Sequence, residues 1–379
     1  DVYKRQDLAY VIRGLGRTPG FTAAVVLTLA LGIGANATMF GVVDHLLLSP
    51  PAHVEDPGDV VRLQVHRVSP FTGQPQVMAY QTYADYRDFL GAGTLESLAA
   101  FGDEEVVLGR GEEAARVTAV LSTSSFFPLL GVRPALGRFF DDSEDQPGAE
   151  GVVVLGHNLW QSRFGGREDI LGQSLPRGNQ SYTVIGVAPA GFNGVDLPPV
   201  SLFLPHQAYT RLRGTDRWVE SRGYYWMQAI ARLAPNSTPQ AAADEATALH
   251  LNGRREYVEE DRYPADARIV LGSVKAALGP DAPGEIQVSR WLIGVTVIVL
   301  LIACANVANL LLARGTRRRR ELGVRVALGI PRRRMVGQLF LESTFLAALG
   351  GVVALGVAYW GGQIVRNTLL PDVAWPPSP

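Results

Sequence analysis

The chain has 379 residues, of which 47% are hydrophobic and 19% are charged, and its formal net charge is −1 at pH 7. Its single cysteine, Cys304, excludes an internal disulfide, a paired-cysteine zinc site and a redox pair. Neither of its two lysines, Lys4 and Lys275, follows a glycine, so the Gly-Lys-Ser/Thr phosphate loop and ATP hydrolysis by that route are also excluded.

Three stretches of 23 uncharged residues are each long enough to cross a bilayer as an α-helix. They cover residues 21–43, 291–313 and 343–365. With their flanks, they predict transmembrane helices over residues 21–48, 289–313 and 336–365. The fold class expected is therefore a membrane α-helical protein with one large extramembrane domain between its first two spans.

The basic residues beside these helices predict their orientation. Lysine and arginine are concentrated in the segment 1–20 and in the loop 314–335, and positive residues in short loops stay in the cytoplasm. The domain 49–288 and the tail 366–379 are then expected outside. The whole is expected to be a multi-pass protein of an inner (plasma) membrane, in contact with its lipid.

The segment 1–20 carries Leu8, Ile12 and Leu15 at helical spacing. This pattern is typical of an amphipathic helix on the inner membrane surface, a cytoplasmic juxtamembrane element. An ordinary basic segment explains the pattern equally well.

The external domain, 49–288, has 30 acidic and 20 basic residues, a balance of −10. Nucleic acid is not expected as a partner, because phosphates require a basic face. Helices are predicted at 80–90, 125–130, 157–164 and 238–254, and strands at 60–65, 115–121, 152–155, 182–187, 224–233 and 267–274. This is an α+β pattern, in which residues 122–215 are predicted to form an inserted subdomain.

No motif in the chain predicts catalysis. Gly-x-Ser-x-Gly and His-Glu-x-x-His are both missing from the sequence, so no catalytic residue, metal or cofactor is expected. The acid cluster Asp141, Asp142, Glu144 and Asp145 lacks the spacing of a calcium loop and predicts a solvated turn.

Small and polar residues inside the spans predict close helix packing. They are Gly32, Gly34, Asn36, Asn306 and Asn309. Small residues let helix backbones approach, and amides form hydrogen bonds between helices in lipid. A polar path for a substrate is the alternative interpretation.

The loop 314–335 predicts an amphipathic helix around Glu321–Leu328, in which Glu321 and Arg325 are four residues apart. A signal for membrane topology alone would explain the arginines. It would not explain the regular order of the apolar residues, which fits a helix that binds another protein.

Several runs in the chain resemble MacB/FtsX-type ABC transporter permeases. They are Thr18-Pro19-Gly20-Phe21, Leu29-Ala30-Leu31-Gly32-Ile33-Gly34-Ala35-Asn36, Gly131-Val132-Arg133-Pro134-Ala135-Leu136-Gly137-Arg138, Val184-Ile185-Gly186-Val187-Ala188-Pro189 and Arg320-Glu321-Leu322-Gly323-Val324-Arg325-Val326-Ala327-Leu328-Gly329. The resemblance is strongest to the branch called acidobacterial duplicated orphan permeases.

The resemblance implies a MacB periplasmic core domain, an FtsX-like permease domain and a mechanotransmission role in transmembrane transport or efflux. A separate cytoplasmic ABC ATPase subunit would bind ATP and magnesium, and a periplasmic partner is also implied. By position, the residues coupled to that ATPase are Arg320, Glu321, Gly323, Arg325, Ala327 and Gly329. The alternative is an FtsX-like signalling subunit that transmits the ATPase state without transport.

The family pattern has four spans in each unit, so a fourth span is expected beyond Pro379. A second permease unit is implied too, either as a homodimer partner or as an internal duplicate. The substrate is not indicated by the sequence.

Overall fold

The computed structural model describes the greater part of the chain. The described residues are 15, 18–44, 49–69, 72–109, 111, 114–177, 180–196, 198–274, 282–317, 327 and 332–369. The chain divides into two compact units, a helical unit from residues 1–45 and 287–371 and a sheet domain from residues 46–286 and 372–379.

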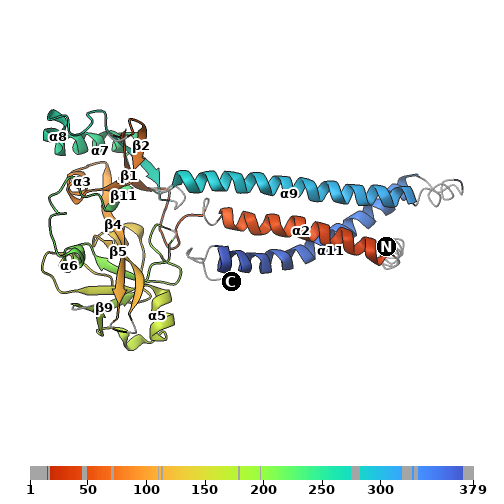
Figure 1. Cartoon of the computed structure of the whole chain (residues 1–379), viewed down its shortest axis with the longest axis horizontal. Helices are drawn as coiled ribbons and strands as arrows, with labels where there is room; N and C mark the ends of the chain where they lie inside the picture. The colour runs from red at the N-terminus through yellow and green to blue at the C-terminus, as the bar shows by residue number, and fades with distance from the viewer. Residues whose placement is uncertain are drawn as a thin grey trace. The chain divides into compact units, whose positions relative to one another are not determined.

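The helical unit consists of long apolar helices, drawn in Figure 1. Its elements are α2 (Pro19–Val43), α9 (Ala282–Arg317), α11 (Arg332–Ile364) and the short π-helical turn η5 (Val365–Leu369). Three helical segments are long and apolar enough to cross a membrane, Pro19–Val43, Gly294–Ala313 and Phe340–Thr368. The three predicted spans are therefore confirmed.

Helix α9 is longer than a membrane requires. A span of about 20 residues crosses the hydrocarbon core, whereas α9 has 36 residues. Its apolar part begins at Gly294, so the residues from Ala282 onwards extend the helix by roughly 18 Å at 1.5 Å per residue.

The sheet domain is built on one mixed sheet. Its strands are β1 (Val60–Val68), β2 (Pro75–Met78), β3 (Tyr80–Gln81), β4 (Leu95–Leu108), β5 (Ala115–Ser122), β6 (Leu136–Gly137), β7 (Val152–Leu155), β8 (Ser174–Arg177), β9 (Gln180–Val187), β10 (Leu202–Pro205), β11 (Met227–Leu233) and β12 (Arg268–Ser273). The main path has the order β12-β1-β11-β4-β5-β10-β7-β9-β6, with β2, β3 and β8 beside it. The pairs β5–β10 and β7–β9 are parallel and the other pairs are antiparallel.

Short helices cover this sheet. They are α3 (Tyr83–Phe89), α4 (Phe126–Leu130), α5 (His157–Phe164), the 3₁₀ turn η3 (Glu168–Ile170), α6 (Ala208–Arg213), α7 (Pro239–Gly253) and α8 (Arg255–Glu259). The segment 122–215 contributes β6 to β10 to the continuous sheet, and its separation as an inserted subdomain stays a prediction.

The sheet has apolar side chains on both faces. Alternate residues of a strand point to opposite faces, and in β7 Val153 and Leu155 join one core cluster while Val152 and Val154 join the other. The first cluster includes residues of α3, α6 and α7, and the second includes the aromatic residues of α4. Both faces are therefore buried within the domain.

Most predicted elements of the domain lie where the sequence placed them. Strand β7 and helix α5 coincide with the predictions, and α7 ends one residue earlier than predicted. The helix predicted from Tyr80 begins only at Tyr83, because Tyr80 and Gln81 pair with β11 and Thr82 caps the helix. The α+β pattern is thereby confirmed.

Strand β4 lies in the middle of the sheet and was not predicted. Its 14 residues include the run Gly102-Asp103-Glu104-Glu105, which interrupts the apolar pattern of a strand. Glycine and acidic residues are depleted in strands, but the pairing of β4 with β5 continues through this run.

Candidate functional site

Two glycines of α2 lie where another helix backbone comes close. A Cβ on Gly32 would lie 2.5 Å from the Cβ of Ala303 on α9, and one on Gly34 would lie 2.7 Å from the Cβ of Val357 on α11. Any side chain would force the helices apart. Small residues in such places are typical of helix contacts in membranes, and a packing role for Gly32 and Gly34 stays a prediction.

The contacts also give the relative directions of the helices. Along α2, Leu29 contacts Gly350 of α11, and further along Thr38 Oγ1 donates a hydrogen bond of 3.2 Å to the carbonyl of Ala358. The residue numbers of the contacting pairs increase along both helices, so α2 and α11 run in the same direction. Val25 packs in one cluster with Val307 of α9, whereas Gly32 meets Ala303, so α9 runs in the opposite direction. The predicted out–in–out topology requires these directions.

The three asparagines of the spans differ in their surroundings. Asn36 Nδ2 donates to the carbonyl of Gly32 at 2.6 Å within α2, and its buried Oδ1 has no hydrogen-bond partner among the described residues. Asn306 and Asn309 are exposed on α9, and no described side chain is hydrogen-bonded to them. Their role in helix packing stays a prediction.

The predicted coupling residues of the cytoplasmic loop lie almost entirely outside the described residues. This applies to Arg320, Glu321, Gly323, Arg325 and Gly329. Ala327 is described, and it is helical and exposed. Most of segment 1–20 is likewise outside, apart from a helical and buried Leu15 and residues 18–20.

The sheet domain connects to the membrane helices through two neighbouring strands. Strand β1 is the first strand after α2, and β12 is the last before α9. The two strands pair antiparallel, with Val61 opposite Ser273 and His66 opposite Arg268. The start of β1 and the end of β12 are therefore side by side, and both connections enter the domain at one end of one ladder.

Helix α7 is attached to β12 and to α3 by buried polar contacts. The backbone N–H of Ile269 on β12 donates to Thr247 Oγ1 at 2.9 Å. After α7, Arg254 donates to both carboxylate oxygens of Asp85 on α3, with Nε–Oδ1 at 2.8 Å and Nη2–Oδ2 at 2.6 Å. Such bidentate pairs are strong and geometrically specific. They hold α3 and α7 together.

Asp85 is the centre of this polar cluster and is fully buried. Burial alone would raise the pKa of Asp85, but the hydrogen bonds and charge of Arg254 outweigh it and hold that pKa below its ordinary value. Arg222 adds a contact of 3.3 Å to Oδ1, and Thr82 completes a capping box with Asp85. Asp85 is thus ionised and fully partnered.

His250 of α7 lies beside this carboxylate. Burial, followed by the nearby arginines, lowers the pKa of His250 from 6.5 to about 4, although Asp85 opposes the shift. Its Nδ1 is 3.4 Å from Asp85 Oδ1, and its Nε2 is 2.8 Å from the Tyr263 hydroxyl. At neutral pH the imidazole is therefore uncharged, and its contact with Asp85 is not an ion pair.

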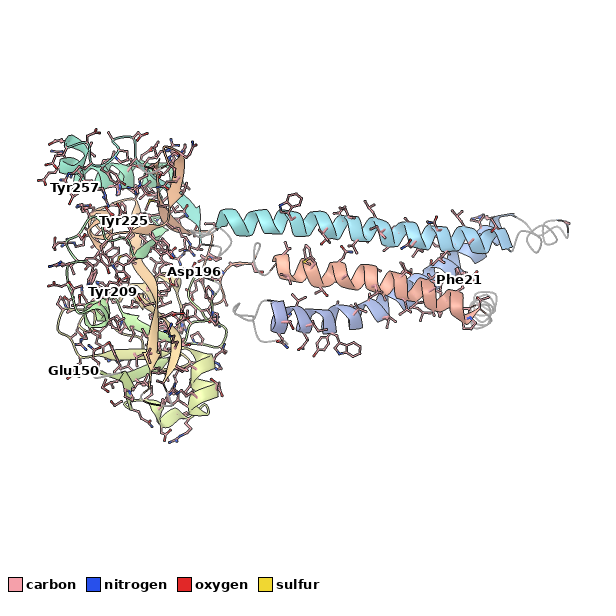
Figure 2. All side chains as sticks on the ribbon, in the orientation of Figure 1. Phe21, Glu150, Asp196, Tyr209, Tyr225 and Tyr257 are labelled. Atoms are coloured by element: carbon pink, nitrogen blue, oxygen red, sulfur yellow. The ribbon has the colours of Figure 1, made fainter. Side chains whose placement is uncertain are left out.

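A second buried cation stabilises β1. Arg62 is 1% exposed and donates to Asp196 Oδ1 at 2.5 Å, to the Val195 carbonyl at 3.1 Å and to the side chain of Gln228 on β11; Asp196 is labelled in Figure 2. Arg62 thus ties β1 to β11 and to the segment 195–196.

No local pattern in the sequence reveals the Asp85 cluster or the Arg62 cluster. Asp85 and Arg254 are 169 positions apart, a separation that no local pattern reveals. One available signal was the capping-box pattern Thr82-x-x-Asp85, which locates the start of a helix but not its buried partner.

One residue of the acid cluster at 141–145 is buried, although the sequence predicts a solvated turn. Asp141, Asp142 and Glu144 are accessible, but Asp145 is buried, and its carboxylate lies 2.7 Å from His206 Nδ1. It also accepts the backbone N–H of Ser124 at 3.1 Å. Asp145 therefore anchors this turn to the sheet.

Two protein families match this chain, one over its first two thirds and one over its C-terminal part. Residues 22–249 match the family described as MacB-like periplasmic core domain. Residues 293–377 match the family described as FtsX-like permease C-terminal.

Curated relatives have names that refer to export. The chain is 26% identical to the pyoverdine export ATP-binding/permease protein PvdT of Pseudomonas entomophila (strain L48), over 93% of this chain and 49% of that protein. It is 28% identical to the macrolide export ATP-binding/permease protein MacB of Nitrosomonas europaea, over 66% of this chain and 36% of that protein. The chain thus spans about half, or less, of the length of these relatives.

A solved structure was also similar, the periplasmic region of MacB from Actinobacillus actinomycetemcomitans. It has 13% sequence identity and a TM-score of 0.41, and the match covers 57% of this chain and 90% of that one.

Proposed function

The chain belongs to the MacB-like periplasmic core domain family and is a permease of the MacB/FtsX type, and on that premise we propose that it transmits the work of an ATPase to its external domain. The proposed activity is export, or extraction from the outer side of the inner membrane. The names of the relatives support export, because they denote ATP-binding/permease exporters.

The observation that carries this proposal is the β1–β12 ladder. The connections from α2 and α9 end on two strands that pair side by side, with Val61 opposite Ser273. A movement of either helix, passed along the connecting chain, would therefore reach a hydrogen-bonded pair of strands in the sheet. The bidentate Arg254–Asp85 contact then connects this pair, through α7, to α3.

The ATPase is proposed to act at the loop 314–335, through Arg320, Glu321, Gly323, Arg325, Ala327 and Gly329. In this proposal the ATPase is a separate cytoplasmic subunit that binds ATP and magnesium, unlike the relatives, whose names combine ATP-binding and permease functions. A second permease unit would complete the transporter. Assignment to the acidobacterial duplicated orphan permeases is part of the same proposal.

The test is co-purification of an ATPase subunit with the complete protein expressed in its host. Reversing the predicted loop pair, Glu321→Lys with Arg325→Glu, should abolish that association and leave membrane insertion intact. The matched control is Arg255→Glu with Glu256→Lys on α8, which makes the same charge reversal in the sheet domain and should change nothing.

Two results would contradict the proposal. If no ATPase co-purifies with the folded protein, the chain does not couple to one. If the reversed loop prevents insertion itself, the loop is mainly a topology signal. An ATPase that associates while no substrate is moved would favour the FtsX-like signalling function instead.

A further inference from the structure

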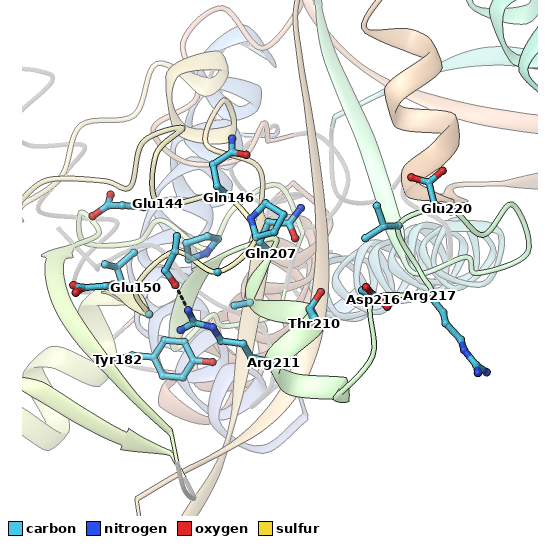
Figure 3. A pocket seen from close by; sticks show the side chains of 18 residues that line it. Glu144, Gln146, Glu150, Tyr182, Gln207, Thr210, Arg211, Asp216, Arg217 and Glu220 are labelled. Carbon is cyan, nitrogen blue, oxygen red and sulfur yellow. Dashed lines mark hydrogen bonds between the residues drawn. The ribbon is translucent and has the colours of Figure 1, made fainter.

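Arg67 on strand β1 is a half-buried arginine without an acceptor. Six arginines of the sheet domain have described side chains that are buried or half-buried. Five of them donate to a carboxylate, an amide or a backbone carbonyl: Arg62, Arg211, Arg222, Arg232 and Arg254. The bond from Arg211 to the carbonyl of Ala149 is the dashed line in the pocket of Figure 3. Arg67, the sixth, donates no hydrogen bond and forms no ion pair within the described residues, and its Nε is buried. Its fork of N–H donors therefore has no acceptor from the described protein.

Two tyrosine rings fix the position of this guanidinium. The Arg67 Cζ lies 5.6 Å from the ring centre of Tyr225 and 5.3 Å from that of Tyr263. Tyr263 is buried, and its hydroxyl lies 2.8 Å from Nε2 of the uncharged His250, so its ring is held in place. The rings attract the positive charge, but contact with a ring face leaves the in-plane N–H donors unpaired. The guanidinium is therefore positioned before a ligand arrives, which limits the entropy lost on binding.

The carboxylates of the neighbouring polar cluster are already paired. Asp85 accepts the bidentate pair from Arg254, and Asp88 accepts two hydrogen bonds from Arg222, at 2.6 and 3.2 Å. Arg254 lies over the same two tyrosine rings as Arg67, with its Cζ at 5.6 and 4.5 Å from their centres. These residues thus hold three guanidinium groups and two carboxylates. The one positive charge in excess is that of Arg67.

Two more hydrogen-bond donors lie beside Arg67. Gln76 of β2 is its direct partner in the β1–β2 ladder, and side chains of directly opposite residues are neighbours on one face of a sheet. The Gln76 amide donates to Met78 Sδ at 3.4 Å, and a thioether is a weak acceptor. The hydroxyl of Tyr225, labelled in Figure 2, is hydrogen-bonded to no residue that the structure describes. Together, these three side chains offer donors and no negative charge.

We propose that Arg67, Gln76 and Tyr225 form a binding site for an oxyanion, the carboxylate or phosphate group of a small ligand. A guanidinium fork binds either group through two parallel N–H···O bonds, and the amide and the hydroxyl donate to the remaining oxygen positions. The acidic balance of the external domain opposes anions at long range, but physiological salt screens that field beyond about 8 Å. Contacts at the site therefore decide the affinity. The site requires only the folded sheet domain, so it is independent of the ATPase proposal.

The test is protection of Arg67 from phenylglyoxal, a reagent that modifies accessible arginines, in the full chain in phosphatidylcholine nanodiscs. Labelling of each arginine is followed by mass spectrometry of its peptide, in a buffer without sulfonate, carboxylate or phosphate. Inorganic phosphate and benzoate are the probes, each compared with chloride at equal ionic strength, and benzamide is the neutral analogue of benzoate. Arg133 and Arg268 are internal controls, because both are exposed and neither forms an ion pair within the described residues.

We expect at least one of the two anions to slow the labelling of Arg67 relative to Arg133 and Arg268, in a saturable manner. A probe at ten times its Kd should give roughly tenfold protection, since only the free site reacts. Protection by phosphate alone assigns a phosphate group, protection by benzoate alone assigns a carboxylate, and protection by both assigns a site that accepts either. Benzamide should give no protection, because it has no negative charge.

A second measurement does not depend on the reagent. The protecting anion should raise the Tm of the parent protein above its value in chloride, because it binds only the folded state. This rise should vanish in Arg67→Gln and become smaller in Arg67→Lys, which keeps the charge but loses the fork. The matched control, Arg268→Gln on the neighbouring strand β12, removes the same charge from an exposed position and should retain the full rise.

The site is rejected if neither anion protects Arg67, or if benzamide protects it as well as benzoate does. It is also rejected if folded Arg67→Gln shows the same rise in Tm as the parent, because the anion then binds elsewhere. Should Arg67 not react even in chloride, the thermal measurement decides, and the absence of any rise in the parent is the rejecting result. None of these results alters ATPase co-purification, so the failure of this site would leave the proposed function intact.

Discussion

Different interactions stabilise the interior of the sheet domain and the interior of the helical unit. The sheet domain has two apolar clusters and fully buried charges, among them Asp85 and Arg254. In the helical unit, close packing depends on glycine: because Gly32 and Gly34 have no side chain, α9 and α11 can approach α2. The solvent explains this difference. Water drives apolar side chains together in the domain, whereas lipid is as apolar as leucine and leaves close packing as the main attraction.

The comparison indicates which substitutions each unit tolerates least. In the domain, removing one buried charge leaves its partner without compensation. Between the helices, adding one methyl group is enough to separate them.

The largest effect is expected for Asp85→Asn. The change leaves Arg254 buried without its carboxylate, and breaking a buried pair in this way costs about 3–5 kcal/mol. Urea unfolding of the protein, followed by its tryptophan fluorescence, which includes that of buried Trp218, would measure the loss. The control, Glu220→Gln, removes an exposed partner of Arg87 and should have no measurable effect; equal loss in both variants would contradict the role of Asp85.

The next effect is a dependence on pH that comes from His250. Its folded pKa of about 4 lies below the unfolded value of 6.5, so between these values the unfolded chain binds a proton that the folded domain does not. Stability should be full above pH 6.5 and fall as the pH drops to 4, by a total on the order of 3 kcal/mol.

The measurement is unfolding free energy at a series of pH values, for the parent protein and for His250→Gln. The variant should be less dependent on pH across this window, although its stability at pH 7 is lower. An unchanged slope would show that His250 does not titrate in this way.

The smallest effect is expected in the membrane. Gly32→Leu places a side chain against Ala303, and overpacking of this kind costs about 1–3 kcal/mol. The same helix offers a matched control, because a Cβ on Gly41 would meet nothing within 4 Å. Thermal unfolding in detergent should therefore show a lower Tm for Gly32→Leu than for Gly41→Leu, and equal values would remove the contrast between the two units.

The helices of the helical unit could be predicted from the sequence because the signals for them are local. Runs of 23 uncharged residues located the spans, and glycines within them predicted close contacts. The spacing of Asn306 and Asn309 did not indicate a partner, and the structure leaves both exposed. Which helix faces meet depends on packing between distant segments.

The sheet domain could be predicted only in part, because some of its features depend on contacts between distant segments. Strand β7 is a continuous apolar run and helix α7 begins at the proline after Thr238, so both leave a local signal. Strand β4 contains an acidic run, and its pairing with β5 continues through that run. The Asp85–Arg254 pair is formed by segments far apart in the chain. A local reading of the acid cluster could not distinguish buried Asp145 from its solvated neighbours.

The register of β1 against β12 has a mechanical consequence. Hydrogen bonds in an antiparallel ladder are perpendicular to the strands. A pull along the strands therefore stretches all of them together, and the ladder resists as a unit. A pull that separates Val61 from Ser273 breaks the hydrogen bonds between the two strands one after another, starting from that end of the ladder. The same ladder is stiff toward sliding of the two membrane connections and compliant toward their separation.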